Sequence, residues 1–494
     1  MSSVNLPASM SLAAFKKVDT MSIDTQILDP VTITNESCRF VLQRKGILNT
    51  GSAIQLGVTH DQANNEYYLP IKTGIHALIK TATLRIGTTI IAQTDQNGHY
   101  QTMVRQFKTN EQKTRIDGAT KGTCDGLEPD GRGDGGAGAA YQYQPALVHW
   151  AFSSVNGVVP GLIKPTNEDN NTALFSIKMS EIFPVLRDFA LPLFAISEPV
   201  TVELIFNKQS GPTQLGVICC KESGKAAPTI IPSKPNCKMI VDYLTYSDDR
   251  TNEVLAAIMS EQGLAIPYSD LLLSTSSTPS APAVPAGGQH TDQIIATELG
   301  FSGKTIKNIM WTDTLDTGTA GAPQPLAENI VFEGAYTSQA YMKPDQYQVR
   351  VNDMNVYNRP LVNEAQKQSE VAKIMGNDIC VGGGEYSMDL ITEKNTYTIN
   401  NNVFANVTVE GHSVQSAVIG GRKVMTLDGL QHICGCDLTT NPATGKGTKI
   451  NQKPILLERT LPRSQYDCTQ RTTRCWGTYE RLMVIQGGNV SVSA

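Results

Sequence analysis

The sequence is poor in charged and aromatic residues, and it has no long hydrophobic run. Charged side chains make up 18% of its 494 residues, and it has only three tryptophans, at positions 150, 311 and 476. So few tryptophans are unusual for a cleft that stacks sugar rings. No apolar run approaches the roughly 18–20 residues of a membrane-spanning helix. The run SLAAF near the start is too short for a signal-peptide core, so we expect no secretion.

The sequence also lacks the positive charge of a protein that binds nucleic acid. Its formal net charge is −5, so the chain as a whole does not attract a phosphate backbone. The basic stretch GKGTK, with Lys446 and Lys449, is too short to change this balance. We therefore expect no specific binding of nucleic acid.

The ten cysteines follow no recognised metal-binding or disulfide pattern. Their spacing is irregular, and a chain of this size does not need disulfide staples, so we expect free thiols. Cys219 and Cys220 lack the two-residue spacer of a redox pair. The segment HICGC offers His432, Cys434 and Cys436 to zinc, but no paired motif supplies a fourth ligand. Other candidate ligands lie far away in sequence: His412, Cys468 and Cys475.

The segment GFSGKT, residues 300–305, resembles a phosphate-binding loop only in part. That motif requires a glycine five residues before Gly303, where this sequence has Glu298. The residues that follow alternate like a strand, whereas a phosphate-binding loop must open a helix. We therefore predict a turn that enters a strand.

The segment DGRGDGG, residues 130–136, could be a calcium loop or an adhesion motif. A calcium loop that starts at Asp130 would have Arg132 at its third position and Tyr141 at its twelfth, where ligand oxygens are required. Arg-Gly-Asp at 132–134 could bind a receptor of the integrin type. A solvated, Gly-rich loop tip is the simpler interpretation.

Signature motifs of hydrolases are absent as well. The sequence has no G-x-S-x-G or H-E-x-x-H motif, and its seven histidines form no cluster. The many Asp and Glu residues leave open a carboxylate pair of the glycoside-hydrolase type. We assign no catalytic, cofactor-binding or metal-binding residue, and we expect no enzyme.

What the sequence does contain is typical of strands joined by long loops. Its 41 glycines accompany abundant Pro, Thr and Asn, and its length suits two domains of about 200 residues or slightly more. We predict an N-terminal arm over residues 1–25 and a first domain over 26–248, with a long loop at about 94–141. The second domain spans 249–494, with a flexible loop at about 274–290.

Alternating apolar residues predict strands throughout the first domain. The clearest run has Phe175, Ile177 and Met179 on one face, and alternation resumes over Val200–Phe206. Between these strands, Ser180 is predicted to cap a short amphipathic helix that Pro192 ends. Other strands are predicted at Cys38–Gln43, Ala53–Val58, Ile71–Ile79, Thr83–Ala92, Leu147–Ser153 and in CKMIVDYLTYSDD.

The second domain repeats this pattern. A helix over DRTNEVLAAIMSEQG ends at Gly263, and a second helix from about Val362 to Met375 is closed by Gly376. Strands are predicted at Tyr347–Val351, Tyr386–Leu390 and Val403–Val409, and in the closing YERLMVIQGGNVSVSA. Both halves are therefore predicted to be mostly β, with one or two short helices each.

These segments resemble double jelly-roll major capsid proteins. The run FSIKMSEIFPVLRDFALPLF, followed by VTVELIFNK and CKMIVDYLTYSDDR, is similar to the end of the first jelly roll in that family. The segment YYLPIKTGIHALIKTATLRIG resembles a strand pair near its core. YQVRVNDMNVYNRP and YERLMVIQGGNVSV look like the corresponding strands of the second jelly roll. The family includes capsid proteins of nucleocytoplasmic large DNA viruses, virophages and polinton-like viruses.

The resemblance implies an all-β fold of two tandem eight-stranded jelly-roll barrels, with short helices in the connecting loops. Three chains would form a pseudo-hexameric homotrimer that tiles the icosahedral shell of a double-stranded DNA virus. The two long loops would stand on the outer surface. The implied partners are neighbouring capsomers and minor capsid, penton or cement proteins, in a virion assembled inside the infected host cell. Contact with an internal membrane is left open.

Two other functions share the local sequence features. A minor capsid or spike protein with jelly-roll domains would have the same strand pattern. A two-domain β-sandwich enzyme that acts on carbohydrates would also have it, and would need paired carboxylates.

Overall fold

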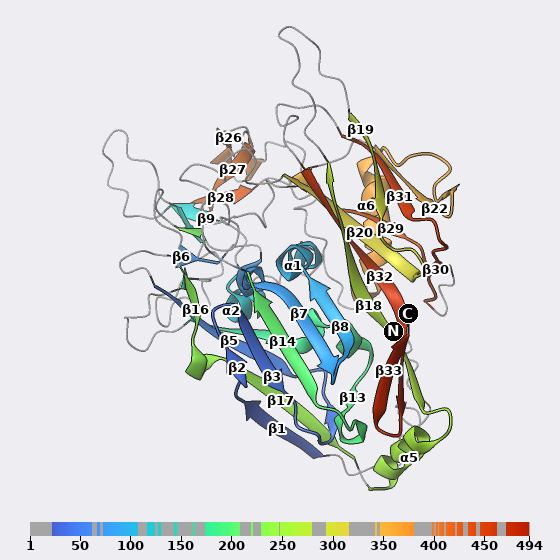
Figure 1. Ribbon diagram of the computed structural model, residues 1–494. Coiled ribbons are helices and arrows are strands. Elements are labelled where there is room, and N and C mark those ends of the chain that lie inside the picture. Colours follow the sequence, from blue (N-terminus) through green and yellow to red (C-terminus); the bar gives the residue numbers. More distant parts are fainter. Residues whose placement is uncertain are drawn as a thin grey trace.

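The computed structural model consists mostly of antiparallel β-sheet with a few short helices, which confirms the predicted fold class (Figure 1). The residues that the structure describes are 22–61, 67–69, 73–106, 116–123, 127–129, 143–145, 162–163, 173–207, 219–220, 229–246, 248–278, 293–315, 341–342, 346–379, 398–399, 402–403, 405–409, 412–419, 422–427, 433–440, 445–461 and 471–493.

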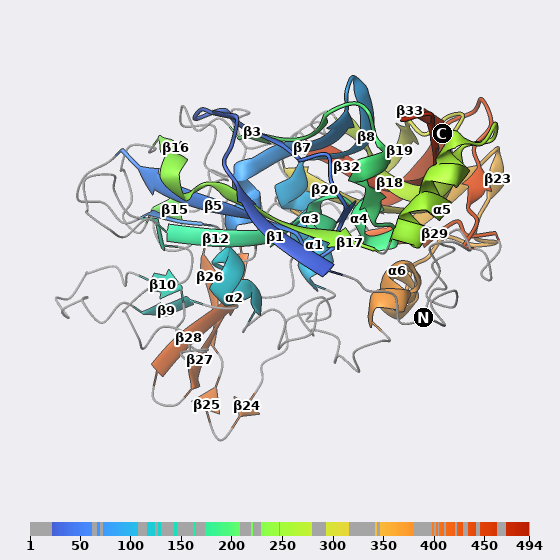
Figure 2. The ribbon, with the colours of Figure 1, turned by 90° about the horizontal axis from the view of Figure 1, so that it is seen from below.

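Two sheets pack face to face in the first half (Figure 2). Their strands are β1 (Ser22–Leu28), β2 (Thr32–Ile33), β3 (Ser37–Val41), β4 (Ile47–Leu48), β5 (Ala53–His60), β7 (Ile79–Ile86), β8 (Thr89–Asp95), β12 (Ala173–Lys178), β13 (Leu191–Pro192), β14 (Val200–Phe206), β16 (Ile230–Pro232) and β17 (Lys238–Thr245). One sheet has the order β12-β5-β17-β4-β13, with β1 beside β17 and β16 beside β5; the other has the order β2-β3-β14-β7-β8. Alternate residues such as Leu56, Val202 and Val241 fill the core.

The second half is built in the same way. Its strands are β18 (Leu264–Thr278), β19 (Gln293–Leu299), β20 (Thr305–Leu315), β21 (Tyr341–Met342), β22 (Gln346–Val351), β23 (Met354–Asn355), β29 (Cys434–Asp437), β30 (Thr448–Lys449), β31 (Ile455–Leu461), β32 (Arg471–Gln486) and β33 (Asn489–Ser493). One sheet has the order β18-β32-β20-β21, with β29, β30 and β33 attached, and the other has the order β19-β31-β22-β23. Between them lies a core that includes Trp311, Tyr347 and Leu457.

Two long strands connect the halves. β18 and β32 pair over their whole length, from Leu264 opposite Ile485 to Thr278 opposite Arg471, and they run from one half into the other (Figure 1). At their lower ends, Ile266 and Met483 belong to the core of the first half. The cores of the two halves therefore share one continuous strand pair.

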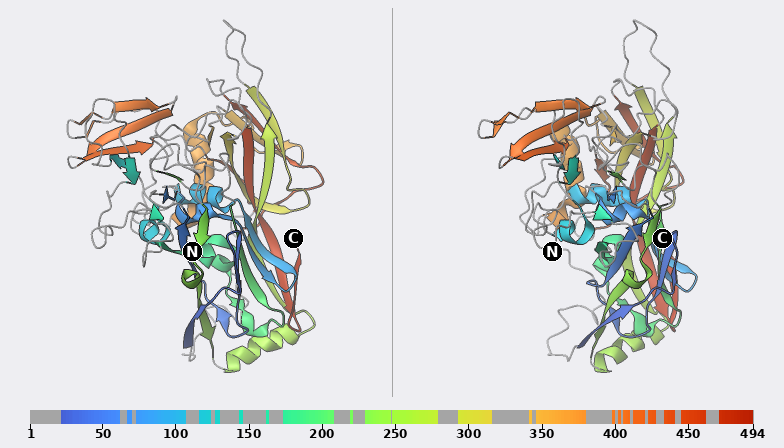
Figure 3. Two further views of the ribbon diagram at one scale, coloured as in Figure 1. Left: turned by 60° about the vertical axis from the view of Figure 1, so that its left-hand side comes forward. Right: turned by 90° about the vertical axis from the view of Figure 1, so that its left-hand side faces the viewer.

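The remaining elements are short. The helices are α1 (Asn97–Gln106), α2 (Gly118–Lys121), α3 (Met179–Ile182), α4 (Val185–Asp188), α5 (Asp248–Met259) and α6 (Glu364–Ile379), with 3₁₀ turns η2 (Gly74–Leu78), η5 (Leu193–Ala195) and η6 (Lys234–Asn236). Small sheets contain β6 (Tyr67–Tyr68), β9 (Leu127–Pro129), β10 (Tyr143–Pro145), β11 (Leu162–Ile163), β15 (Cys219–Cys220), β24 (Thr398–Ile399), β25 (Asn402–Val403), β26 (Ala405–Val409), β27 (His412–Ile419) and β28 (Arg422–Leu427). Figure 3 shows α5, in light green, at one end of the molecule and the β26–β28 sheet, in orange, toward the other.

Most of the predicted strands are confirmed where the structure describes them. They include β3, β5, β12, β14, β17, β22, β26 and the closing hairpin of β32 and β33. The predicted helix after Asp248 is α5, but it ends at Met259 and not at Gly263. Gly263 has a φ of +67° in the turn that enters β18.

Three predictions in the first half are wrong. Within the predicted strand Ile71–Ile79, residues 74–78 form η2, and Ile79 is the first residue of β7. Thr83–Ala92 is not one strand but a hairpin, since β7 and β8 turn at Gly87 with a φ of +54°. The predicted loop at 94–141 contains α1 and α2, whose mainly polar sequences gave no apolar stripe.

Predicted element ends also differ. Ser180 does not cap the helix, because α3 begins one residue earlier at Met179, and Pro192 lies in β13, beyond the end of α4. Gly376 does not close α6, which continues to Ile379. β18 extends to Thr278, into the loop predicted at 274–290, and β1 includes the end of the predicted 1–25 arm.

Some predictions lie outside the described residues. They are the helical turn at Leu12–Lys17, the strands at Leu147–Ser153 and Tyr386–Leu390, and the Arg-Gly-Asp segment at 132–134.

Candidate assembly surfaces

The junction between the halves is formed by α1 on the outer face of β18, β20 and β32. Tyr100 and Met103 of α1 pack with Trp476 in one buried cluster that also includes Val371 of α6. The Trp476 indole Nε1 donates a hydrogen bond to the Asp95 carbonyl oxygen at 3.2 Å. A helix that follows β8 of the first half is therefore held against strands of the second half.

A charged pair lies at the same junction. The Arg481 Nη1 atom donates to the Asp270 Oδ2 atom at 2.9 Å and to the Ile91 carbonyl oxygen at 2.7 Å. The Tyr268 hydroxyl donates to the same carbonyl at 2.7 Å. Burial raises the pKa of Asp270 to about 6, although Arg481 and the backbone N–H of Leu271 oppose the rise. The pair ties β8 to both long strands.

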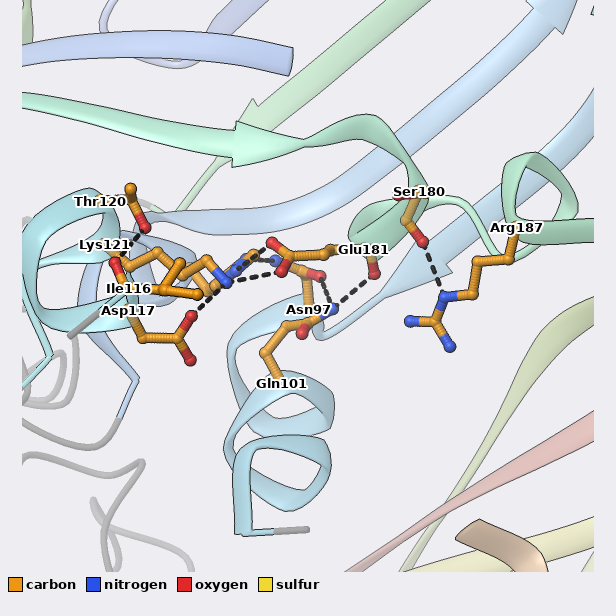
Figure 4. A network of polar contacts seen from close by, with 10 residues as sticks. Asn97, Gln101, Ile116, Asp117, Thr120, Lys121, Ser180, Glu181 and Arg187 are labelled. Atoms are coloured by element: carbon orange, nitrogen blue, oxygen red, sulfur yellow. Dashed lines mark hydrogen bonds and ion pairs between the residues drawn. The ribbon is translucent and has the colours of Figure 1, made fainter. Parts of the chain in front are cut away.

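A second polar network holds α2 against the first half (Figure 4). The Lys121 Nζ atom donates to Asp117 Oδ1 at 2.7 Å and to Glu181 Oε1 at 2.6 Å. Burial opposes the charge on Lys121, but Glu181 and Asp117 outweigh burial and raise its pKa. Gln101 of α1 donates to the Glu181 carbonyl oxygen at 2.8 Å, so the network joins α1, α2 and α3.

The network is closed to a substrate. Lys121 is only 4% exposed and Asp117 only 2%, and both carboxylates are engaged by the ammonium group. A buried lysine that is kept protonated by two carboxylates does not act as a nucleophile or a base. We therefore assign this cluster a structural role.

The segment 300–305 adopts the predicted turn. Gly303 has a φ of +76°, and β20 begins at Thr305, so a strand stands where a phosphate-binding loop needs a helix. The Lys304 Nζ atom lies 5.5 Å from the centre of the Tyr479 ring.

Five cysteines lie in the two cores: Cys38, Cys237, Cys434, Cys436 and Cys475. Burial, and then Cys237, raises the pKa of Cys38 to about 12, and burial raises the pKa of Cys436 to about 12. Cys434 and Cys436 of the HICGC segment point into the second core from β29, while His432 lies outside the described residues. No group of three or more His, Cys, Asp or Glu residues within the described ranges is placed to hold a metal ion.

A polar depression lies beside the turn at Gly303. It is lined by Ser302, Gly303, Asn352, Asp353, Lys449, Ile450, Asn451, Gln452 and Lys453. Asp353 supplies the one carboxylate among these residues and is paired with Lys453. Glycoside hydrolysis needs two carboxylates across one site, so this depression lacks that arrangement.

Exposed apolar side chains occur in both halves. More than half of the residue surface is exposed at Ile23, Ile27, Val31, Ile116, Leu174, Met259, Ile294, Met354 and Val362. Two of these lie on β1, at the edge of the first half (Figure 1). No helix in the described part of the chain is long and apolar enough to cross a membrane.

Sequence reasoning assigned no site residue and missed both polar networks. Lys121 and Glu181 are 60 residues apart, and Asp270 and Arg481 are 211 apart, so no local pattern brings them together. The alternation of Ile23 and Ile27 with polar residues in SIDTQIL was a visible strand signal.

Comparison with known proteins gives a match in structure but not in sequence. No protein-family model matches the chain, and no curated protein matches it. VP54 of PBCV-1, in a structure fitted into a reconstruction of the virophage Sputnik, is similar with a TM-score of 0.52 and 13% identity, over 97% of this chain and 98% of that one. The Faustovirus major capsid protein gives 0.52 and 10%, over 96% and 92%. A chain of the Sputnik virophage gives 0.53 and 10%, over 96% and 88%.

These similarities cover both halves of the chain. The fold is therefore the double jelly roll, as the resemblance in sequence implied.

Proposed function

We propose that this chain is the major capsid protein of a double-stranded DNA virus. The observation that carries the proposal is the two-way coverage: the chain matches the Faustovirus major capsid protein over 96% of its own length and 92% of that chain. An enzyme that shares only a single β-sandwich domain with a capsid protein would be expected to match that protein over one domain. The proposal makes the protein a component of the virion, assembled inside the infected cell.

The unit of assembly in this proposal is a homotrimer. Two barrels from each of three chains give six barrels, an outline that can tile a flat facet. The edge strand β1, on which Ile23 and Ile27 are exposed, supports the idea that a partner covers part of the barrel surface. An obligate interface of this kind buries roughly 2,000 Å² or more, so it persists on dilution.

The same proposal assigns the two jelly rolls to parts of the chain and names their partners. The first jelly roll comprises residues 26–248 and the second comprises 249–494, and the loop predicted at about 274–290 is proposed to stand on the outside. Neighbouring capsomers and minor capsid, penton or cement proteins are the proposed partners. We assign no catalytic residue and no cofactor.

Light scattering and electron microscopy of the purified protein test this function. We expect a particle of three times the chain mass of 53.5 kDa, with a hexagonal outline in negative stain. A monodisperse monomer at micromolar concentration that forms no lattice when concentrated would contradict the proposal. Chain copy number in purified virions separates a major from a minor capsid or spike protein, because only a major protein accounts for most of the shell.

A further inference from the structure

β1 is an edge strand with one open side. Among the described residues it pairs with β17 alone, from Ser22 opposite Thr245 to Leu28 opposite Met239. Alternate N–H and C=O groups along its other edge therefore face away from the sheet. An open edge that carries apolar side chains is a template for pairing with another strand.

On the exposed face of β1, one isoleucine lies on each side of the polar Thr25. Ile23 is 59% exposed and Ile27 is 67% exposed. On β17 they lie opposite Leu244 and Ile240, which are half-buried. Between them, the Thr25 hydroxyl donates to Asp242 Oδ1 at 2.6 Å.

The sequence of β1 is nearly palindromic about Thr25. Reading outward from Thr25 in SIDTQIL, Asp24 matches Gln26 and Ile23 matches Ile27. Two copies paired antiparallel about this centre would set Ile23 of one against Ile27 of the other. Gln26 would donate its amide to Asp24 of the other copy, a contact these side chains already make within one strand at 3.3 Å.

We infer that β1 pairs antiparallel with β1 of a second copy, around a two-fold axis through Thr25, and that this contact joins neighbouring capsomers. The inference rests on the proposed capsid function. Across the four strands, Leu244, Ile23, Ile27 and Ile240 would form a continuous apolar row on each side of the axis. The two Thr25–Asp242 pairs would lie in the middle.

Symmetry places this contact between trimers rather than within one. A two-fold contact uses the same patch on both chains, whereas a three-fold ring joins two different patches. A self-complementary strand therefore suits a link between capsomers, where two identical edges can meet.

Cysteine cross-linking tests the register. Residues directly opposite in an antiparallel pair have Cα atoms about 4.5–5.5 Å apart, within the range of about 4.4–6.8 Å that a disulfide accepts. Thr25→Cys should therefore give disulfide-linked dimers in assembled material under copper-phenanthroline oxidation. Ile23→Cys is the matched control, because its copies would lie about 13 Å apart along the strands. Cross-linking of Ile23→Cys but not of Thr25→Cys, or of neither variant above wild type, would overturn the inference.

Paired charge substitutions test the function of the contact. The double variant I23K/I27K should remain a trimer but lose assembly into lattices, because lysines would face each other across the axis. The double variant I23K/I27E should restore assembly, since each Lys would face a Glu of the other copy. Loss of the trimer in I23K/I27K would place β1 within the capsomer and refute the two-fold contact. If wild type were no trimer while Thr25→Cys still dimerised, the capsid function would fail and the β1 contact would stand.

Discussion

At the scale of single residues, Lys121 is a buried positive charge that is paired with two carboxylates. It lies between Asp117 and Glu181 with almost no exposure. Lys121→Met would leave two carboxylates without their cation, and removing one partner of a buried pair costs about 3–5 kcal/mol. Chemical denaturation should report this loss. Lys453→Met, which breaks the exposed pair with Asp353, is the control and should cost about 0–1 kcal/mol. Equal effects of the two substitutions would contradict the structural role of the network.

Asp270 makes the stability of the protein depend on pH. Its pKa is about 6 in the folded chain, above the ordinary value of 3.8, so the folded state holds this proton more tightly than the unfolded state does. The contribution of Asp270 therefore favours folding at low pH and declines as the pH rises through about 6.

The expected result is a difference between wild type and Asp270→Asn that changes with pH. Wild type should gain up to about 3 kcal/mol relative to the variant as the pH falls from 7 to 4. Urea denaturation across this range measures the gain. Asp353→Asn, which changes an exposed carboxylate, serves as the control. A difference that stayed flat with pH would show that Asp270 is not held as the structure indicates.

At the scale of elements, a glycine sets how closely η2 and α2 can approach. Gly74 has a φ of +61°, and a Cβ atom there would lie 2.2 Å from the Lys121 carbonyl oxygen. Gly303 has a similar φ of +76°, but a Cβ atom there would meet nothing within 4 Å. Both Gly→Ala substitutions carry the left-handed backbone cost of about 1–2 kcal/mol. Gly74→Ala should cost clearly more, because backbone atoms must also move. Melting temperatures that fall equally in both variants would refute the close contact.

The elements that the sequence predicted correctly are those in which buried and exposed residues alternate regularly along the chain. Alternation in β12, β14 and β17 follows directly from one face being buried. Helix α1 shows no such stripe, because polar residues such as Asn97, His99 and Gln101 are buried in it. Its position depends on Trp476, which is contributed by a strand near the other end of the chain. The networks at Lys121 and Arg481 depend on long-range pairing in the same way, so the pattern of one segment could not show them.

At the scale of the whole molecule, the two jelly rolls share structure rather than merely touching. Leu264, Ile266, Met483 and Ile485 come from the long strands of the second half but are buried in the core of the first. Helix α1 makes the reverse contact, from the first half onto β32 of the second. In the proposed capsid function, the two barrels of one chain must not rotate against each other. This mutual exchange of core residues would resist such a rotation.

Shared cores predict cooperative unfolding. Since the first core is incomplete without the ends of β18 and β32, the two halves should melt together in one calorimetric transition. The fragment 22–248, produced alone, should expose apolar surface, bind a hydrophobic dye and lack a sharp transition. The full chain carrying Trp476→Ala tests the contact between α1 and β32 with both halves present. Loss of this buried side chain should lower the stability of both halves by about 3–5 kcal/mol, because α1 belongs to one half and β32 to the other. Two separate transitions in the full chain, or a fragment 22–248 that melts as sharply and at the same temperature as the full chain, would show that the barrels fold independently of each other.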